Sequence, residues 1–134
     1  MRRLHLVLGI LTLLAFLTTG QIMRLHQPPL STLTDATRLL YRSRHIYILG
    51  AGLVNLMLGL YLQPAFPGWR RITQTVGSAL VLLAPVLLVL GFATEPRTGL
   101  PLEQGWASAG LYSLFGGSLL HAVAHIGKPA KPGL

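Results

Sequence analysis

Three histidines are the side chains in this 134-residue chain that are best able to carry chemistry. His121 and His125 are four positions apart, so both imidazole rings can point to one side of a helix. Such a pair suits a metal ion, and one histidine from each of two helices can ligate a haem. His5 is then the third ligand or the opposing axial ligand. The candidate cofactor-binding residues are therefore His5, His121 and His125, for haem b or a metal ion.

The same histidines have a simpler interpretation, in which they form hydrogen bonds between helices or lie level with lipid headgroups. No carboxylate lies near them in the sequence to complete a metal site, and the chain has no cysteine, which excludes thiolate sites and iron–sulfur clusters. The sequence also shows no Ser-His-Asp set, phosphate loop or carboxylate pair for hydrolysis or phosphoryl transfer. These absences favour a protein that is not an enzyme.

A second set of polar residues is basic, and its members lie close together in one short segment. Arginine offers a rigid donor fork for phosphate or carboxylate, so this group predicts either binding of anionic lipid headgroups or a site for an anionic substrate. We favour headgroups, which act as counterions for arginines at the membrane surface. The formal net charge of +8 does not indicate nucleic acid, because the chain has no basic run with interleaved aromatics. The residues of this group are Arg38, Arg42, Arg44 and His45.

Four apolar stretches must position these side chains, at about residues 4–26, 45–63, 70–94 and 106–127. Each approaches the roughly 20 residues that a helix needs to cross a bilayer core of ~30 Å. The chain is 51% hydrophobic and only 10% charged, and none of the stretches contains an acid, which weighs against proton-coupled transport. We expect an all-α polytopic membrane protein, a bundle of four transmembrane helices in a single domain over residues 1–134.

The segment before the second stretch predicts an amphipathic connector. Ser31 or Thr34 can cap a helix there, with Asp35 in its first turn facing the positive end of the helix dipole. Apolar residues then recur at helical spacing, so the segment lies at the membrane surface and runs into the second span. The recurring residues are Leu33, Ala36, Leu39 and Leu40.

The second and fourth stretches share a pattern of small residues four positions apart. Such ridges let helix backbones approach closely and let a polar side chain bond across the helix pair. This pattern could have arisen in two ways, by duplication of a two-helix hairpin or by chance recurrence of Ala, Gly and Leu. The predicted helix-packing residues are Ala51, Asn55 and Gly59 in one stretch and Ala109, Ser113 and Gly117 in the other.

Basic residues set the expected orientation. Arg2, Arg3, Arg70, Arg71 and the lysines of the tail share one side of the bundle without any acid. By the positive-inside rule we expect both termini in the cytoplasm, in a bacterial inner (plasma) membrane. The basic start and the apolar run that follows also resemble a signal peptide, but the apolar core continues past Gly20, which favours a retained helix.

The resulting functional prediction is a small non-enzymatic integral membrane protein. It is a structural or accessory subunit whose helices pack against partner subunits or copies of itself. One alternative is a haem- or metal-binding electron-transfer subunit that uses His5, His121 and His125. Another is a small transporter or lipid-binding protein with its ligand between the helices.

Overall fold

A computed structural model of the protein describes residues 1–63, 67–98 and 105–126. All regular secondary structure in these residues is helical, which confirms the predicted all-α class. The elements are α1 (Arg2–Arg24), a short 3-10 helix η1 (Leu30–Thr32), α2 (Asp35–Tyr61), α3 (Trp69–Thr98) and α4 (Trp106–His125).

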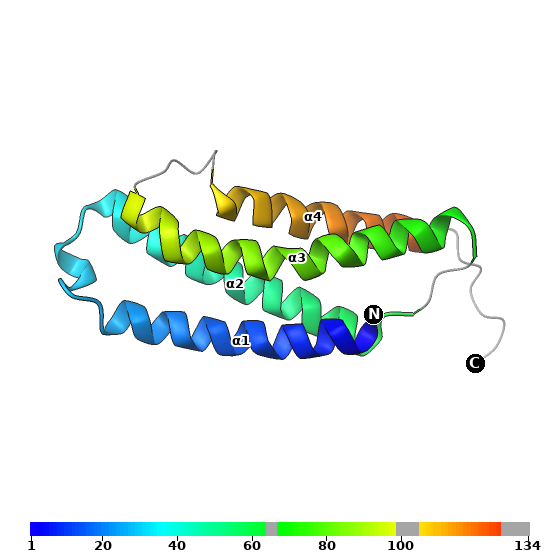
Figure 1. Cartoon of the computed structure of the whole chain (residues 1–134), viewed down its shortest axis with the longest axis horizontal. Coiled ribbons are helices and arrows are strands. Elements are labelled where there is room, and N and C mark those ends of the chain that lie inside the picture. Colours follow the sequence, from blue (N-terminus) through cyan, green and yellow to red (C-terminus); the bar gives the residue numbers. More distant parts are fainter. Residues whose placement is uncertain (64–66, 99–104, 127–134) are drawn as a thin grey trace.

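The four long helices lie side by side along one axis, as Figure 1 shows. The helix α1 packs mainly against α2 and α3 mainly against α4, and the two hairpins meet through α2 and α3. The chain runs up and down, so the starts of α1 and α3 lie at the same end of the bundle as the ends of α2 and α4 (Figure 1). We call this the histidine end, because His5 and His121 lie there.

The helix boundaries follow local signals in the sequence. Thr34 caps α2, because its side chain accepts a hydrogen bond from the backbone N–H of Thr37. The expected connector and second span are therefore one helix that begins at Asp35. The helix α3 continues past the predicted end near residue 94, through Pro96, so Glu95 lies inside a helix and not in a loop.

Glycines bring the paired helices into backbone contact. A Cβ atom placed on Gly59 would lie 2.6 Å from the backbone nitrogen of Leu6 in α1. Between α3 and α4, a Cβ atom on Gly117 would lie 2.7 Å from the carbonyl oxygen of Gly77. Any larger side chain at these positions forces the backbones apart, so glycine is required by the close approach.

Large apolar side chains cover the outside of the bundle, and its largely apolar core also contains polar and charged side chains. The buried polar or charged side chains come from all four helices, whereas large apolar side chains line the outside. Two helices, α1 and α3, are long and apolar enough to cross a membrane, with mean hydropathy of 2.0 and 2.5 over their most apolar windows. The buried polar residues are His5, Thr12, Thr19, Arg44, Asn55, Gln74, Ser78, Glu95 and His121.

Among the described residues, α2 and α4 do not reach the mean hydropathy and low charge that mark α1 and α3 as candidate membrane spans. Three arginines and Asn55 lie in α2, and α4 contains serines, glycines and two histidines, which lower the mean hydropathy of both. A bundle in which all four helices cross the membrane is therefore not established by hydropathy.

The glycine contacts predict a contrast between two alanine variants. Gly59→Ala should lower the free energy of unfolding by about 1–3 kcal/mol, because the new methyl group meets the Leu6 backbone. Gly50→Ala is the matched control, since no atom lies within 4 Å of a Cβ there, and it should be neutral or stabilise the helix by up to about 1 kcal/mol. Unfolding followed by circular dichroism in detergent measures both, and equal stability of the two variants would contradict the close contact.

Candidate functional site

The side chain of Asn55 organises the histidine end. Its amide nitrogen donates to the carbonyl oxygens of Ala51 (2.9 Å) and Val81 (3.1 Å), and its amide oxygen lies 2.8 Å from Nδ1 of His5. Because both amide hydrogens are used, the oxygen accepts the remaining bond and His5 Nδ1 is the donor. In the neutral imidazole, Nε2 of His5 therefore carries a lone pair and no proton.

The ring of His121 faces this network from α4. Its Nε2 lies 3.2 Å from the hydroxyl oxygen of Ser78 in α3, and the two histidine rings have centroids 6.2 Å apart and planes inclined by 74°. His5 is fully buried and His121 is 7% exposed. Two buried atoms of this pair, Nε2 of His5 and Nδ1 of His121, have no hydrogen-bond partner in the described part of the protein.

His125 does not join the pair. Its Nδ1 is hydrogen-bonded to the backbone oxygen of His121 at 2.8 Å, one turn earlier on the same helix. Both residues line a groove of about 360 Å³ that also contacts Met57 and Tyr61 of α2. The structure thus brings His5 and His121 together and leaves His125 at the groove, and no group of three or more His, Cys, Asp or Glu among the described residues could hold a metal ion.

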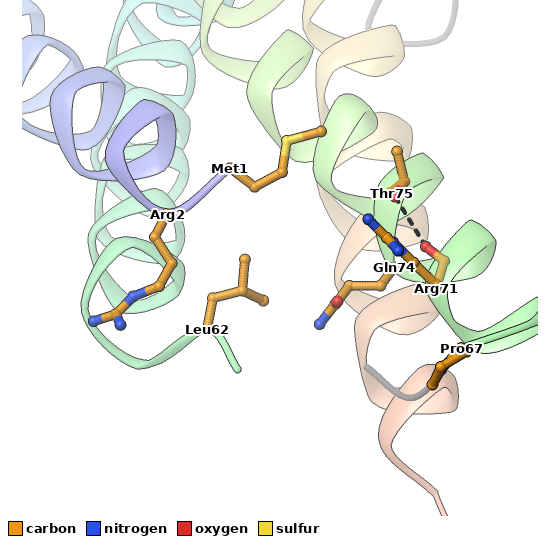
Figure 2. A pocket seen from close by; sticks show the side chains of 7 residues that line it. All are labelled: Met1, Arg2, Leu62, Pro67, Arg71, Gln74 and Thr75. Carbon is orange, nitrogen blue, oxygen red and sulfur yellow. Dashed lines mark hydrogen bonds between the residues drawn. The ribbon is translucent and has the colours of Figure 1, made fainter. Parts of the chain in front are cut away.

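A second cavity, of about 550 Å³, opens at the same end of the bundle. Figure 2 shows Met1 and Arg2 of the α1 start on one side and Arg71 and Gln74 of α3 on the other. Arg2 donates to the carbonyl oxygen of Leu60 at 2.8 Å, so it caps the end of α2. The positive charge that lines this cavity therefore comes from Arg71 of α3.

The opposite end of the bundle holds a buried ion pair. Arg44 Nε and Nη2 lie 2.7 and 2.6 Å from Oε2 of Glu95, and both side chains are completely buried. The other carboxylate oxygen, Oε1, accepts a hydrogen bond of 2.7 Å from the backbone N–H of Ala107, in the first turn of α4. Gly105 makes room for this contact, since a Cβ there would lie 2.2 Å from Glu95 Oε1. The carboxylate therefore caps α4 and faces its positive end.

Sequence reasoning missed this pair. It placed Arg44 in the headgroup-binding group and Glu95 in a loop, whereas the structure joins them inside the bundle. One sequence signal could have indicated the pair. Glu95 is an acid at the end of an apolar helix, and the next helix begins shortly afterwards with backbone N–H groups that need an acceptor.

The other three residues of the basic group have different surroundings. Arg38 forms an exposed ion pair with Asp35, and Arg42 is exposed. His45 is partly buried, with Nδ1 2.9 Å from the hydroxyl of Thr19 and its ring stacked on Phe16 at a centroid distance of 4.1 Å. Arg38 and Arg42 remain available for the predicted headgroup contact.

The predicted small-residue ridges differ between the two helices. In α2, Ala51 and Asn55 are fully buried and Gly59 faces α1. In α4, Gly117 faces α3, whereas Ala109 is exposed and Ser113 is partly buried. The face of α4 that packs inside the bundle is instead formed by Ala107, Gly110, Leu114, Gly117, His121 and Ala124.

Comparison with models of known protein families, with curated proteins and with solved structures finds no match for the chain.

The buried ion pair predicts a large stability effect. Arg44→Met should lower the free energy of unfolding by about 3–5 kcal/mol, because it leaves the carboxylate of Glu95 buried without its counterion. Arg38→Met is the control, since the Arg38–Asp35 pair is exposed, and it should cost only about 0–1 kcal/mol. Chemical denaturation of the two variants in detergent compares them, and a similar small loss in both would show that the buried pair contributes no special stability.

Proposed function

We propose that this chain is a small integral membrane protein with four spans, which acts as a structural or accessory subunit. The observation that carries the proposal is the apolar outer surface of a bundle that buries charged and polar side chains. Fully buried Arg44, Glu95, Asn55 and His5 lie inside, and the outer faces of the helices are apolar. A surface of this kind is stable against lipid and unstable against water.

The buried contacts account for the polar residues that lower the hydropathy of α2 and α4. Arg44 of α2 is neutralised by Glu95, and the amide of Asn55 makes bonds to three other groups. Serines of α4 also bond within the bundle, as Ser118 does to the carbonyl oxygen of Leu114. Polar groups that are paired internally do not face lipid, so these helices can cross the membrane despite their composition.

The exposed face of α4 supports packing against another helix. Ala109 is exposed, and no other atom lies within 4 Å of a Cβ built on Gly116, two turns further along. Small residues on the outside of a membrane helix let a second backbone approach closely. This face is therefore the proposed contact with a partner subunit or with a second copy of the chain.

A second candidate function, binding of a haem or a metal ion for electron transfer, is favoured by one specific observation. His5 and His121 are buried together, and each has a ring nitrogen without a partner. A buried polar atom that makes no hydrogen bond is rare and calls for an explanation, which a bound group supplies.

The four-span proposal predicts a labelling pattern. The chain has no cysteine, so single cysteines can be introduced without background. Leu53→Cys in α2 and Phe115→Cys in α4 should not react with a water-soluble maleimide in native membranes, because both positions face lipid. Ser31→Cys and Arg71→Cys, at opposite ends of the bundle, should react from opposite sides of the membrane. Rapid labelling of Leu53→Cys and Phe115→Cys would place α2 and α4 in water and exclude four spans.

The subunit proposal predicts an association that depends on the outer face of α4. Native mass spectrometry of protein extracted in mild detergent should show the chain bound to a partner or to its own copies. Gly116→Leu should release the monomer, because the larger side chain blocks close approach of the second helix. Gly50→Leu is the matched control, since it also adds bulk where no atom lies within 4 Å, and it should leave the complex intact. A monomeric wild-type protein would refute the subunit function.

A further inference from the structure

We propose that His5 and His121 form a two-coordinate binding site for a monovalent copper ion, Cu(I). The proposal rests on the second candidate function and narrows it to a bare ion held by one imidazole of α1 and one of α4. The ligand atoms are Nε2 of His5 and Nδ1 of His121, the two buried ring nitrogens without a hydrogen-bond partner.

The hydrogen bonds around the pair prepare both rings as ligands. Asn55 fixes the proton of His5 on Nδ1 and so leaves the lone pair of Nε2 free. In the metal-bound state the hydroxyl of Ser78 accepts from Nε2–H of His121, which leaves the lone pair on Nδ1. Ligating histidines usually donate their other ring N–H to an oxygen in this way, which holds the ring in position.

The separation of the rings excludes a direct bond and fits a bridging ion. With centroids 6.2 Å apart, the two nitrogens cannot approach closer than about 3.8 Å, because each lies about 1.2 Å from its centroid. That is longer than any N–H···N hydrogen bond. An ion about 2.0 Å from each nitrogen, with the two ligands opposite one another, places the ring centroids about 6.4 Å apart. The observed 6.2 Å matches this value when both nitrogens point along the line between the rings.

The small number of ligands selects the ion. Zinc takes four ligands, and no third His, Cys, Asp or Glu in the described residues groups with this pair. Cu(I) has a filled d shell, accepts imidazole and thioether ligands, and is stable with two ligands in line. Its single charge also costs less to bury than the double charge of zinc.

The packing around the pair disfavours a haem. The ring centroids are only 6.2 Å apart, and Asn55 joins α1, α2 and α3 by hydrogen bonds at the same level. A porphyrin disc between the rings would have to break these bonds, whereas a single ion would not.

The groove between α2 and α4 provides the route to the site. It is lined by His121 itself and by Met57 and His125, whose thioether and imidazole are ligand types that Cu(I) prefers. The larger cavity at the same end is lined on its α3 side by Arg71, which repels cations. A copper ion therefore reaches the pair through the groove.

Titration of the full-length protein with Cu(I) tests the proposal. The protein is purified in detergent, kept under ascorbate without oxygen, and titrated with Cu(I) against a chromophoric chelator. We expect one ion per chain, and X-ray absorption should show two nitrogen ligands at about 2.0 Å. His5→Ala and His121→Ala should each weaken binding by about 100-fold or more, and Asn55→Ala by about 10-fold, since it only orients His5.

The controls separate this site from other histidines and from loss of fold. His26→Ala should change the affinity by less than about threefold, because its ring is bonded to Pro28 and Tyr41 and belongs neither to the pair nor to the groove. Circular dichroism checks the fold of every variant. If an alanine variant unfolds, His5→Met and His121→Met replace it, and these should retain Cu(I) with sulfur in the absorption spectrum.

Two results of these measurements would overturn the copper site. Equal affinity of the wild type and the His5→Ala, His121→Ala double variant overturns the site, as does a first shell of three or more ligands. A Soret band in the purified protein overturns the bare ion but supports the second candidate function. Failure of the copper titration leaves the labelling and association experiments unaffected, so the membrane-subunit function is judged separately.

Discussion

One amide side chain connects three of the four helices, and the arrangement of the histidine end depends on it. Asn55 lies on α2, receives a hydrogen bond from His5 of α1 and donates one to the backbone of α3 at Val81. It is completely buried, so each of these bonds is made without competition from water. Glycines on both sides of this level bring α1 against α2 and α3 against α4, and the amide sets how the two hairpins meet.

A carboxylate has the corresponding role at the other end. Glu95 of α3 binds Arg44 of α2 through one oxygen and caps the first turn of α4 through the other. A buried ion pair gains little net stability, because desolvation offsets the attraction, but it strongly disfavours arrangements in which either charge lacks its partner. The two polar contacts together specify one register for α2, α3 and α4, which apolar contacts with lipid-like neighbours would leave undetermined.

The sequence contains enough information for the helices but not for these contacts. The apolar stretches, the proline-rich connections and the cap at Thr34 indicate where helices begin and end, and the structure agrees to within a few residues except at the end of α3. The shared depth of His5 and His121 follows from their positions near helix ends on one side of the bundle. That Arg44 meets Glu95 cannot be read from spacing, since they are 51 residues apart and only the packing of α2 on α3 joins them.

The small-residue ridges are a second feature whose packing the sequence does not determine. A spacing of four identifies small residues that share a face, but it does not say whether the face points inward. Ala51 and Gly59 face the inside of the bundle, whereas Ala109 of the matching pattern in α4 faces outward. The inward face of α4 is set by Gly110 and Gly117, which allow contact with Leu88 and Gly77 of α3.

The buried polar side chains differ in whether the bundle supplies them with partners. Arg44, Glu95, Asn55 and Ser78 each have partners within the bundle, as expected where no water can replace a missing bond. The two histidine nitrogens are different, because the surrounding contacts fix each ring through its other nitrogen and leave these atoms facing no donor. Apolar residues at positions 5 and 121 would avoid the free-energy cost of burying a ring nitrogen without a hydrogen bond. Retaining two imidazoles there is consistent with a site that binds something the chain itself does not supply.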